Sequence, residues 1–339
     1  MTTPCARHTC IPLSAPNEWK RALAGVPHAF GHTWGSCSAM ALSTGFPTFL
    51  YTYEEGNTRV VCAIAERRIG AAVDIVTPYG FSGFAGNRPS PEFPSRWRAF
   101  AAERGYVCGY IGVNPLFYDG SYGDPGEMFP YNSLFILDLT QDESTLFAAL
   151  ATNRKRALGA AARQGWEPLQ EPEPLKQFFR ERCVAFLRSR GSAEAYEFSQ
   201  ETLASLASLD NVLFLGAGAP DRVEAVSVFA YTPFSAEYLF GLSLPEGQRY
   251  SAPLIWDGAL RLKALGVPAL NLGGGIRPGD GVAEFKARFG GREVSLGALK
   301  QVYDDEAFVR LCRAAGQDPS GRSGYFPPYR APGLSAAAH

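Results

Sequence analysis

Histidine is nearly absent from this chain of 339 residues. The four histidines are His8, His28, His32 and His339, so that residues 33 to 338 contain none. Histidine is the side chain most often used for acid–base chemistry near neutral pH, and it is a common metal ligand. Most of the chain therefore offers no histidine for either role, and a Ser-His-Asp triad would have to use one of the first three. We expect no metal and no bound cofactor.

Paired cysteines and a strong charge of either sign are also missing. The seven cysteines are scattered and form no C-x-x-C pair, which argues against a zinc site and against a disulfide framework. We expect reduced thiols and a cytoplasmic protein. Lys and Arg number 32 and Asp and Glu 33, for a net charge of −1. Any contact with nucleic acid therefore needs a local basic patch.

Several standard motifs and long apolar runs are absent as well. There is no Walker-type phosphate loop, no G-x-G-x-x-G after a strand, no G-x-S-x-G and no H-E-x-x-H. No apolar run approaches the ~18 residues of a membrane span, and the first residues contain no apolar signal segment. We expect no membrane span, and a monomer.

What the chain does contain is a folded composition and an order of elements that occurs twice. Hydrophobic residues make up 46%, and the length suggests two domains. The first half predicts strands at 47–53, 59–66 and 71–76, a helix at 91–104, and strands at 106–112 and 133–139. The second half predicts strands at 211–217, 223–231 and 235–242, a helix at 252–265, and strands at 268–273 and 292–298. The first three strands of each half start 164 residues apart (211−47, 223−59, 235−71). Chance agreement of generic patterns is the alternative.

Helices are predicted between and after these halves. Thr140 and Glu143 form a capping box for one helix over 141–164, and Pro172 begins another that runs to about Arg190. Ser199 caps a short helix, and a last helix covers 304–315.

Three motifs have the composition of binding or catalytic segments. The first is the Gly/aromatic loop Pro78–Gly86, in which Tyr79, Phe81, Ser82 and Phe84 are candidates to line a substrate pocket. An ordinary packed turn is the alternative. The second is a helix without Asp or Glu between Ser144 and Trp166, a candidate phosphate-binding patch or a solvated helix face; its basic residues are Arg154, Lys155, Arg156 and Arg163. Arg156-x-x-Gly159-x-Ala161 also fits a loose acetyl-CoA pyrophosphate pattern, but it lies inside this helix rather than in a loop after a strand.

The third motif is Gly273-Gly274-Gly275, a short loop, and Phe285-Lys286-Ala287-Arg288-Phe289-Gly290. The two phenylalanines are four residues apart and would pack on one face, which would fix where Lys286 points. A solvated lysine on an amphipathic turn is the alternative.

At this third motif the sequence resembles the Fem family of aminoacyltransferases, which use aminoacyl-tRNA and are tandems of two GNAT-like domains. The family's P-Y-G loop and basic interdomain helix match the first two motifs, and its Y-x-Y-x-G strand and Y-S turn match Tyr238–Gly241 and Tyr250-Ser251. The resemblance covers about 45–300. The family's R-x-H-P appears here as Gly112-Val113-Asn114-Pro115, and the long helical arm of some members has no room.

The resemblance implies an α/β (mixed α+β) fold with mixed sheets and flanking helices. It implies a first, acceptor-side domain over 1–140 completed by a helix at 300–318, a second domain over 141–299, and a flexible tail over 319–339.

The resemblance also implies amide formation between an aminoacyl-tRNA ester and the free amine of a small peptide, a peptidyl-nucleoside antibiotic intermediate or a peptidoglycan precursor. Lys286 would stabilise the oxyanion or the leaving oxygen, and Asp119 and Asp280 would guide a proton. Tyr238, Tyr250 and Phe285 would join the substrate-binding residues, and the four basic residues would bind tRNA. An acyl-CoA-dependent N-acyltransferase and a non-catalytic module that binds tRNA ends or cell-wall peptide are the rival functions.

Overall fold

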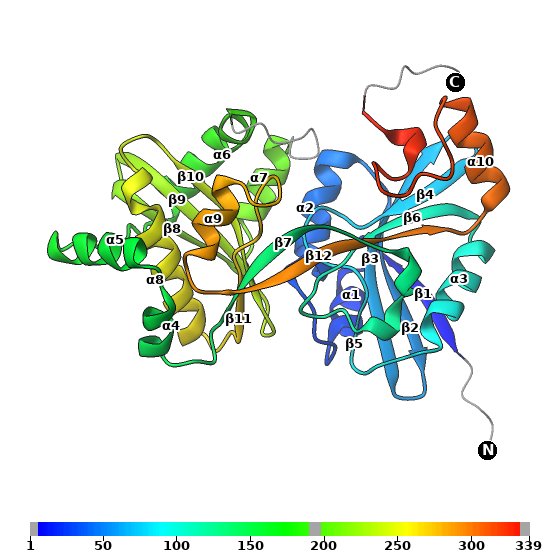
Figure 1. Ribbon diagram of the computed structural model, residues 1–339, viewed down its shortest axis with the longest axis horizontal. Coiled ribbons are helices and arrows are strands. Elements are labelled where there is room, and N and C mark those ends of the chain that lie inside the picture. Colours follow the sequence, from blue (N-terminus) through cyan, green and yellow to red (C-terminus); the bar gives the residue numbers. More distant parts are fainter. Residues whose placement is uncertain (1–5, 190–197, 333–339) are drawn as a thin grey trace. The chain divides into compact units, whose positions relative to one another are not determined.

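The computed structural model describes residues 6–189 and 198–332. The chain divides into two compact units: Met1–Tyr131 together with Leu296–His339, and Asn132–Ser295 (Figure 1). The second unit is one continuous stretch of chain, whereas the first is made of two. The predicted helix end at Arg190 and the predicted tail beyond residue 332 lie outside the described residues.

Unit 1 is built on a mixed sheet with strand order β1-β2-β3-β4-β6-β12 and the short β5 beside β3. β4 and β6 run parallel, and the other neighbours are antiparallel. Its strands are β1 (Arg7–Pro12), β2 (Thr48–Glu55), β3 (Thr58–Ile69), β4 (Ala72–Val76), β5 (Ala85–Gly86), β6 (Tyr106–Gly112) and β12 (Arg292–Val302). Its helices are α1 (Pro16–Leu23), α2 (Trp34–Thr44), α3 (Phe93–Glu103) and α10 (Asp305–Ala314).

Unit 2 repeats this arrangement, with strand order β7-β11-β10-β9-β8. β10 and β11 run parallel, and the other neighbours are antiparallel. Its strands are β7 (Met128–Asp138), which starts in unit 1, β8 (Val212–Ala219), β9 (Arg222–Tyr231), β10 (Ala236–Ser243) and β11 (Ala269–Asn271). Its helices are α4 (Glu143–Ala149), α5 (Thr152–Arg163), α6 (Pro172–Ser189), α7 (Gln200–Ala207), α8 (Ser251–Ala264) and α9 (Gly281–Ala287).

The repeat predicted from the sequence extends to the last strand of each half. β2, β3, β4 and β7 start 164 residues before β8, β9, β10 and β12 (212−48, 222−58, 236−72 and 292−128). The two last strands pair crosswise: β7, from the first half of the chain, pairs with β11 of unit 2, and β12 pairs with β6 of unit 1. Each unit therefore takes its closing strand from the other half of the sequence.

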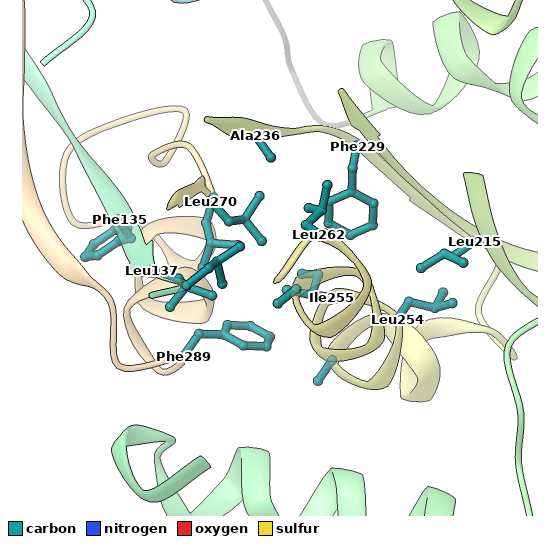
Figure 2. Close-up of a cluster of buried hydrophobic side chains, with 14 of the residues drawn as sticks. Phe135, Leu137, Leu215, Phe229, Ala236, Leu254, Ile255, Leu262, Leu270 and Phe289 are labelled. Carbon is teal, nitrogen blue, oxygen red and sulfur yellow. The ribbon is translucent and has the colours of Figure 1, made fainter. Parts of the chain in front are cut away.

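One core of unit 2 lies between its sheet and α8. Leu254, Ile255 and Leu262 recur at helical spacing and face inward-pointing residues of the sheet, among them Leu215 and Phe229. Figure 2 shows these side chains converging, with Ala236, Leu270 and Phe289 beside them. α6 packs against the opposite face of the sheet, because Phe179 contacts Phe214 and Phe240.

The predicted helix over 141–164 is wrong, because the structure contains two helices there. Asp142, not Thr140, caps α4 by accepting a hydrogen bond from the backbone N–H of Thr145 at 2.8 Å. The chain is then extended at Leu150 and Ala151, where the Ala151 N–H donates to the carbonyl of Arg288 at 3.0 Å. A tertiary hydrogen bond therefore replaces a turn that local propensity favours.

Two parts of unit 1 differ from the sequence-based expectation. β1, α1 and α2 precede the first predicted strand. In the predicted flexible tail, Phe326 and Tyr329 are buried and the Arg330 guanidinium pairs with the buried Asp74. The Gly- and Pro-rich composition hides these anchoring side chains, and residues 319–332 are packed on unit 1 rather than free.

Candidate functional site

The candidate site lies in unit 2, where the parallel strands β10 and β11 stop pairing. They are in register only at Ala236 with Leu270 and at Glu237 with Asn271. Beyond these pairs β10 has a register shift, a bulge, between Tyr238 and Phe240, and β11 ends. The backbone of the strand ends therefore separates here, and the glycines of the third motif follow directly.

Lys286, on α9, lies beside these glycines. Its Nζ donates a hydrogen bond to the carbonyl of Gly274 at 2.8 Å and lies 6.0 Å from the centre of the Tyr238 ring. Gly273 has φ +75°, a backbone conformation that favours glycine, and a Cβ there would lie 2.8 Å from Nζ, so a larger residue would displace the end of the lysine. Burial lowers the pKa of Lys286 to about 8, although the charge of Asp280 acts in the opposite direction.

α9 is held in place by Arg154 of α5. The guanidinium carbon lies 4.1 Å from the ring centre of Phe285 and 5.2 Å from that of Phe289, and one terminal N–H group donates to the Phe285 carbonyl at 3.1 Å. Arg154 is buried, and burial, with help from the charge of Arg288, lowers its pKa. These contacts fix the helix that carries Lys286, so this arginine is engaged inside the protein.

The other three basic residues of α5 differ in their contacts and in their exposure. Lys155 donates to the carbonyl of Ala148, near the end of α4, at 2.7 Å. Arg156 and Arg163 are exposed, and within residues 6–189 and 198–332 neither has a hydrogen bond or ion pair. The predicted tRNA contacts stay predictions, and the exposed pair is the part of the patch that is open to solvent.

The two predicted aspartates both cap short helices. Asp280 accepts hydrogen bonds from the backbone N–H groups of Arg277, Val282 and Ala283 at the start of α9. Burial would raise its pKa, but these hydrogen bonds outweigh it and lower the pKa. Asp119 accepts a hydrogen bond from the backbone N–H of Ser121 at 2.9 Å. The side chain of Ser121 first, and this backbone bond second, lower the pKa of Asp119. Their contacts account for them structurally, and a role in guiding a proton stays a prediction.

The three aromatic candidates of unit 2 lie on different elements. Tyr238 is in the bulge of β10 and packs against the α8 core, and burial raises its pKa to about 12. Tyr250, just before α8, stacks on Trp166 with a centroid distance of 5.2 Å. Phe285 forms the α9 contact with Arg154. Their predicted contacts with substrate are untested.

The Pro78–Gly86 loop lies in unit 1 and is tied down by its backbone. The Nε2–H of the buried His32 donates to the Gly83 carbonyl at 2.9 Å, and Asn114 binds the Phe81 carbonyl through its side chain. Phe84 is fully buried and packs on Phe93 and Trp97, which is the environment of a core residue. Ser82 is buried, whereas Tyr79 and Phe81 are partly exposed. A role for this loop in binding stays a prediction.

Sequence reasoning missed a pair of buried polar residues beside the site. Glu237 is 2% exposed and Asn271 is 1% exposed. Both carboxylate oxygens of Glu237 and the Nδ2 of Asn271 have no hydrogen-bond partner. The sequence feature that could have indicated Glu237 is its place as a glutamate among the mostly apolar residues of β10.

No protein-family model and no curated protein sequence matches this chain. Solved structures do match. FemX superposes with a TM-score of 0.67 at 9% identity, over 90% of this chain and 99% of FemX. L-PGS from Bacillus licheniformis gives 0.54 at 13% identity, over 85% of this chain and 92% of L-PGS. A conserved protein of unknown function from Bacteroides thetaiotaomicron gives 0.59 at 9% identity, over 88% and 100% of the two chains.

At these identities the likeness concerns the fold. Together with the repeated topology, it confirms the predicted α/β fold with two similar halves, and this fold is FemX-like, as the resemblance implied. In the part of the chain that the structure describes, no helix combines the length and apolar character that crossing a membrane requires.

Proposed function

We propose that this protein is an aminoacyltransferase that forms an amide bond, with an aminoacyl-tRNA ester as donor and the free amine of a small acceptor as nucleophile. The observation that carries the proposal is Lys286, held by α9 at the separating ends of β10 and β11 with its Nζ beside Tyr238 and the Gly274 carbonyl. The FemX-like fold and the order of the three motifs support the same class of reaction.

The geometry suits stabilisation of charge rather than histidine chemistry. The amine nitrogen attacks the ester carbonyl, the carbonyl oxygen becomes negative, and the bond to the 3′-oxygen of the ribose then breaks. An ester is already activated, so positioning and a cation near the developing charge can supply much of the rate. Lys286 is that cation in this proposal: its Nζ has three N–H groups and one recorded acceptor among the described residues.

The donor would reach unit 2 along α5. Arg156 and Arg163 are seven residues apart and lie on one face of that helix. Both side chains are exposed, and neither forms an ion pair with another described residue. A row of phosphates, such as the acceptor stem of a tRNA, is the ligand that such a pair fits.

The test is a direct search for product. Purified protein is incubated with total charged tRNA and a panel of amines (dipeptides, aminonucleosides and peptidoglycan precursors), and new amides are sought by mass. We expect one amide that requires charged tRNA and that is lost in Lys286→Ala. Lys176→Ala, in α6 of the same unit, is the matched control. Full activity with acyl-CoA in the absence of tRNA would show that the donor is acyl-CoA. Binding of tRNA without any product would indicate a non-catalytic module.

A further inference from the structure

Glu237 is a buried carboxyl group that the protein leaves without a partner. Both of its oxygens lack a hydrogen bond, and so do the Nδ2 of Asn271, which is its register partner on β11, and the hydroxyl of Ser235. A buried polar group without a partner costs free energy, and buried polar side chains in folded proteins nearly always have one. Three in one place are therefore unusual, and fold stability does not explain them.

Glu237 and Lys286 lie on opposite faces of the same pair of strand ends. Ala236, Tyr238 and Leu270 pack with the α8 core, so alternation along the strands turns Glu237 and Asn271 to the other face. Lys286 contacts Tyr238, which is on the α8 side. A group bound where β10 and β11 separate would therefore meet the lysine from one face and the glutamate from the other.

No charge of the described protein satisfies Glu237. Its register partner on β9 is Ala230, and the residue beside Asn271 on β7 is Ile136. The titratable groups of the helices that cover this face include Lys176, Arg180 and Cys183 of α6 and Glu201 of α7. None of them forms a hydrogen bond or an ion pair with Glu237. The missing partner is thus a donor, and one that carries positive charge would fit best.

We propose that Glu237 receives the acceptor substrate's ammonium group and is the base that removes its proton. This inference rests on the proposed function. The carboxylate takes one proton from the ammonium group and becomes a carboxylic acid. The freed nitrogen lone pair forms the bond to the ester carbon, and the carbon–oxygen bond to the ribose breaks. Of the two protons still on the nitrogen, one goes to the departing 3′-oxygen and the other stays in the amide. Glu237 then returns its proton to solvent.

The proton affinity of this carboxyl group suits the task. Burial alone raises the pKa of Glu237 to about 8, which is close to that of an α-amino group. Proton transfer between groups of similar affinity is efficient, and a positioned acid or base typically contributes about 10²–10⁴-fold in rate.

The experiment compares two nucleophiles in wild type and Glu237→Gln. One is the amine acceptor found by the mass screen, which arrives as an ammonium ion. The other is hydroxylamine, which is already neutral at pH 7 and needs no base. We expect Glu237→Gln to lower kcat/KM for the amine at pH 7 by about 10²–10⁴-fold and to leave only the rise with pH that follows the acceptor's own free-amine fraction, while the rate with hydroxylamine changes less than about threefold. Glu237→Asp should keep part of the rate at pH 7, and Glu224→Gln, on β9, is the matched carboxylate control.

Equal losses with both nucleophiles, or a wild-type rate and pH profile in Glu237→Gln, would overturn this inference. Thermal unfolding of each variant shows whether it is folded, and Gln has the shape of Glu without its charge. If acyl-CoA is a donor and charged tRNA is not, the proposed function is wrong. The same comparison of the two nucleophiles, made with acyl-CoA, then still tests the role of Glu237. Transfer from neither donor overturns both.

Discussion

Lys286 and Glu237 are two ionisable side chains with different surroundings: Lys286 is partly buried and Glu237 is fully buried. Lys286 keeps a carbonyl acceptor and an aromatic ring near its Nζ, so its charge is partly compensated. Glu237 has no compensation in the described protein. A bound ligand of opposite charge would stabilise this unpaired carboxylate. We place the acceptor's ammonium group beside Glu237 for that reason.

These two groups predict a bell-shaped dependence of kcat/KM on pH. The raised pKa of Glu237, about 8, means that its base form appears as pH rises, and the lowered pKa of Lys286, also about 8, means that its cation disappears over the same range. The rate should therefore peak near pH 8. Lys286→Ala should remove the falling limb and lower kcat about 10²–10³-fold, more than it changes KM.

The measurement is a set of steady-state pH profiles for wild type, Lys286→Ala and the control Lys176→Ala. An unchanged kcat in Lys286→Ala would show that this lysine is merely solvated.

We expect Arg154 to affect activity indirectly, by stabilising the protein and fixing the position of α9. Arg154→Ala removes the contacts with both phenylalanine rings and the hydrogen bond to the Phe285 carbonyl. We expect the free energy of unfolding to fall by about 1–3 kcal/mol, because the Phe285 carbonyl loses its buried donor and both rings lose their contact. Arg156→Ala, on the same helix but exposed, should change it by less than about 0.5 kcal/mol. Urea unfolding of both variants checks this, and equal stabilities would show that Arg154 does not anchor α9.

At the scale of the element, α5 shows how one helix divides its charges between structure and solvent. Its inner face supplies Arg154 to α9, and Lys155 closes the end of α4. Arg156 and Arg163 remain available to a ligand. The sequence could identify the acid-free helix, but the division depends on which residues face α9, and that is a tertiary property.

If α5 binds the donor through phosphates, donor use must depend on salt. Each lost phosphate contact lowers the slope of log affinity against log salt by about one. Arg156→Gln and Arg163→Gln should therefore each flatten the rise of KM for aminoacyl-tRNA with salt. Arg182→Gln, an exposed arginine of α6, should leave it unchanged. A KM that does not depend on salt even in wild type would argue against a polyphosphate donor at this helix.

The regular elements were largely predictable, and the candidate site only in part. The strand at 106–112 was predicted with the bounds that the structure has, because a short, nearly continuous apolar run follows the turn at Gly105. Lys286 was identified by its motif. Glu237 was not, because its significance lies in what surrounds it: a burial of 98% and no partner are properties of packing, which one strand's sequence does not contain.

At the scale of the whole molecule, the two halves of the chain are not the two folded units. β7 and β12 have the same length, 11 residues, and start 164 residues apart, yet each closes the sheet of the other half. No periodicity distinguishes a strand that closes its own half from one that closes the other. The partner of a closing strand is decided by packing over the whole chain, so the crosswise pairing could not be predicted from the sequence.

This arrangement predicts different behaviour for two fragments. Residues 132–295 are continuous and contain the whole α8 core, from Phe135 to Phe289, and all three pairs between β7 and β11. We expect this fragment to fold alone. Residues 1–131 lack Ala298–Val302, the strand segment that pairs with β6, as well as Tyr329 and Arg330, which contact Asp74. This fragment leaves the edge of β6 unpaired and should aggregate or stay unfolded.

Joining residues 1–131 to 296–332 through a flexible Gly/Ser linker should restore folding, because it returns β12 to the edge of β6 and the aromatic anchors to their core. Circular dichroism and cooperative thermal unfolding of the three proteins check these outcomes. A cooperative transition in 1–131 alone would contradict the prediction, since it would mean that the first half closes its own sheet. Failure of 132–295 to unfold cooperatively would mean that the second unit needs the first, and the crosswise strands would then bind the two units into one folding unit.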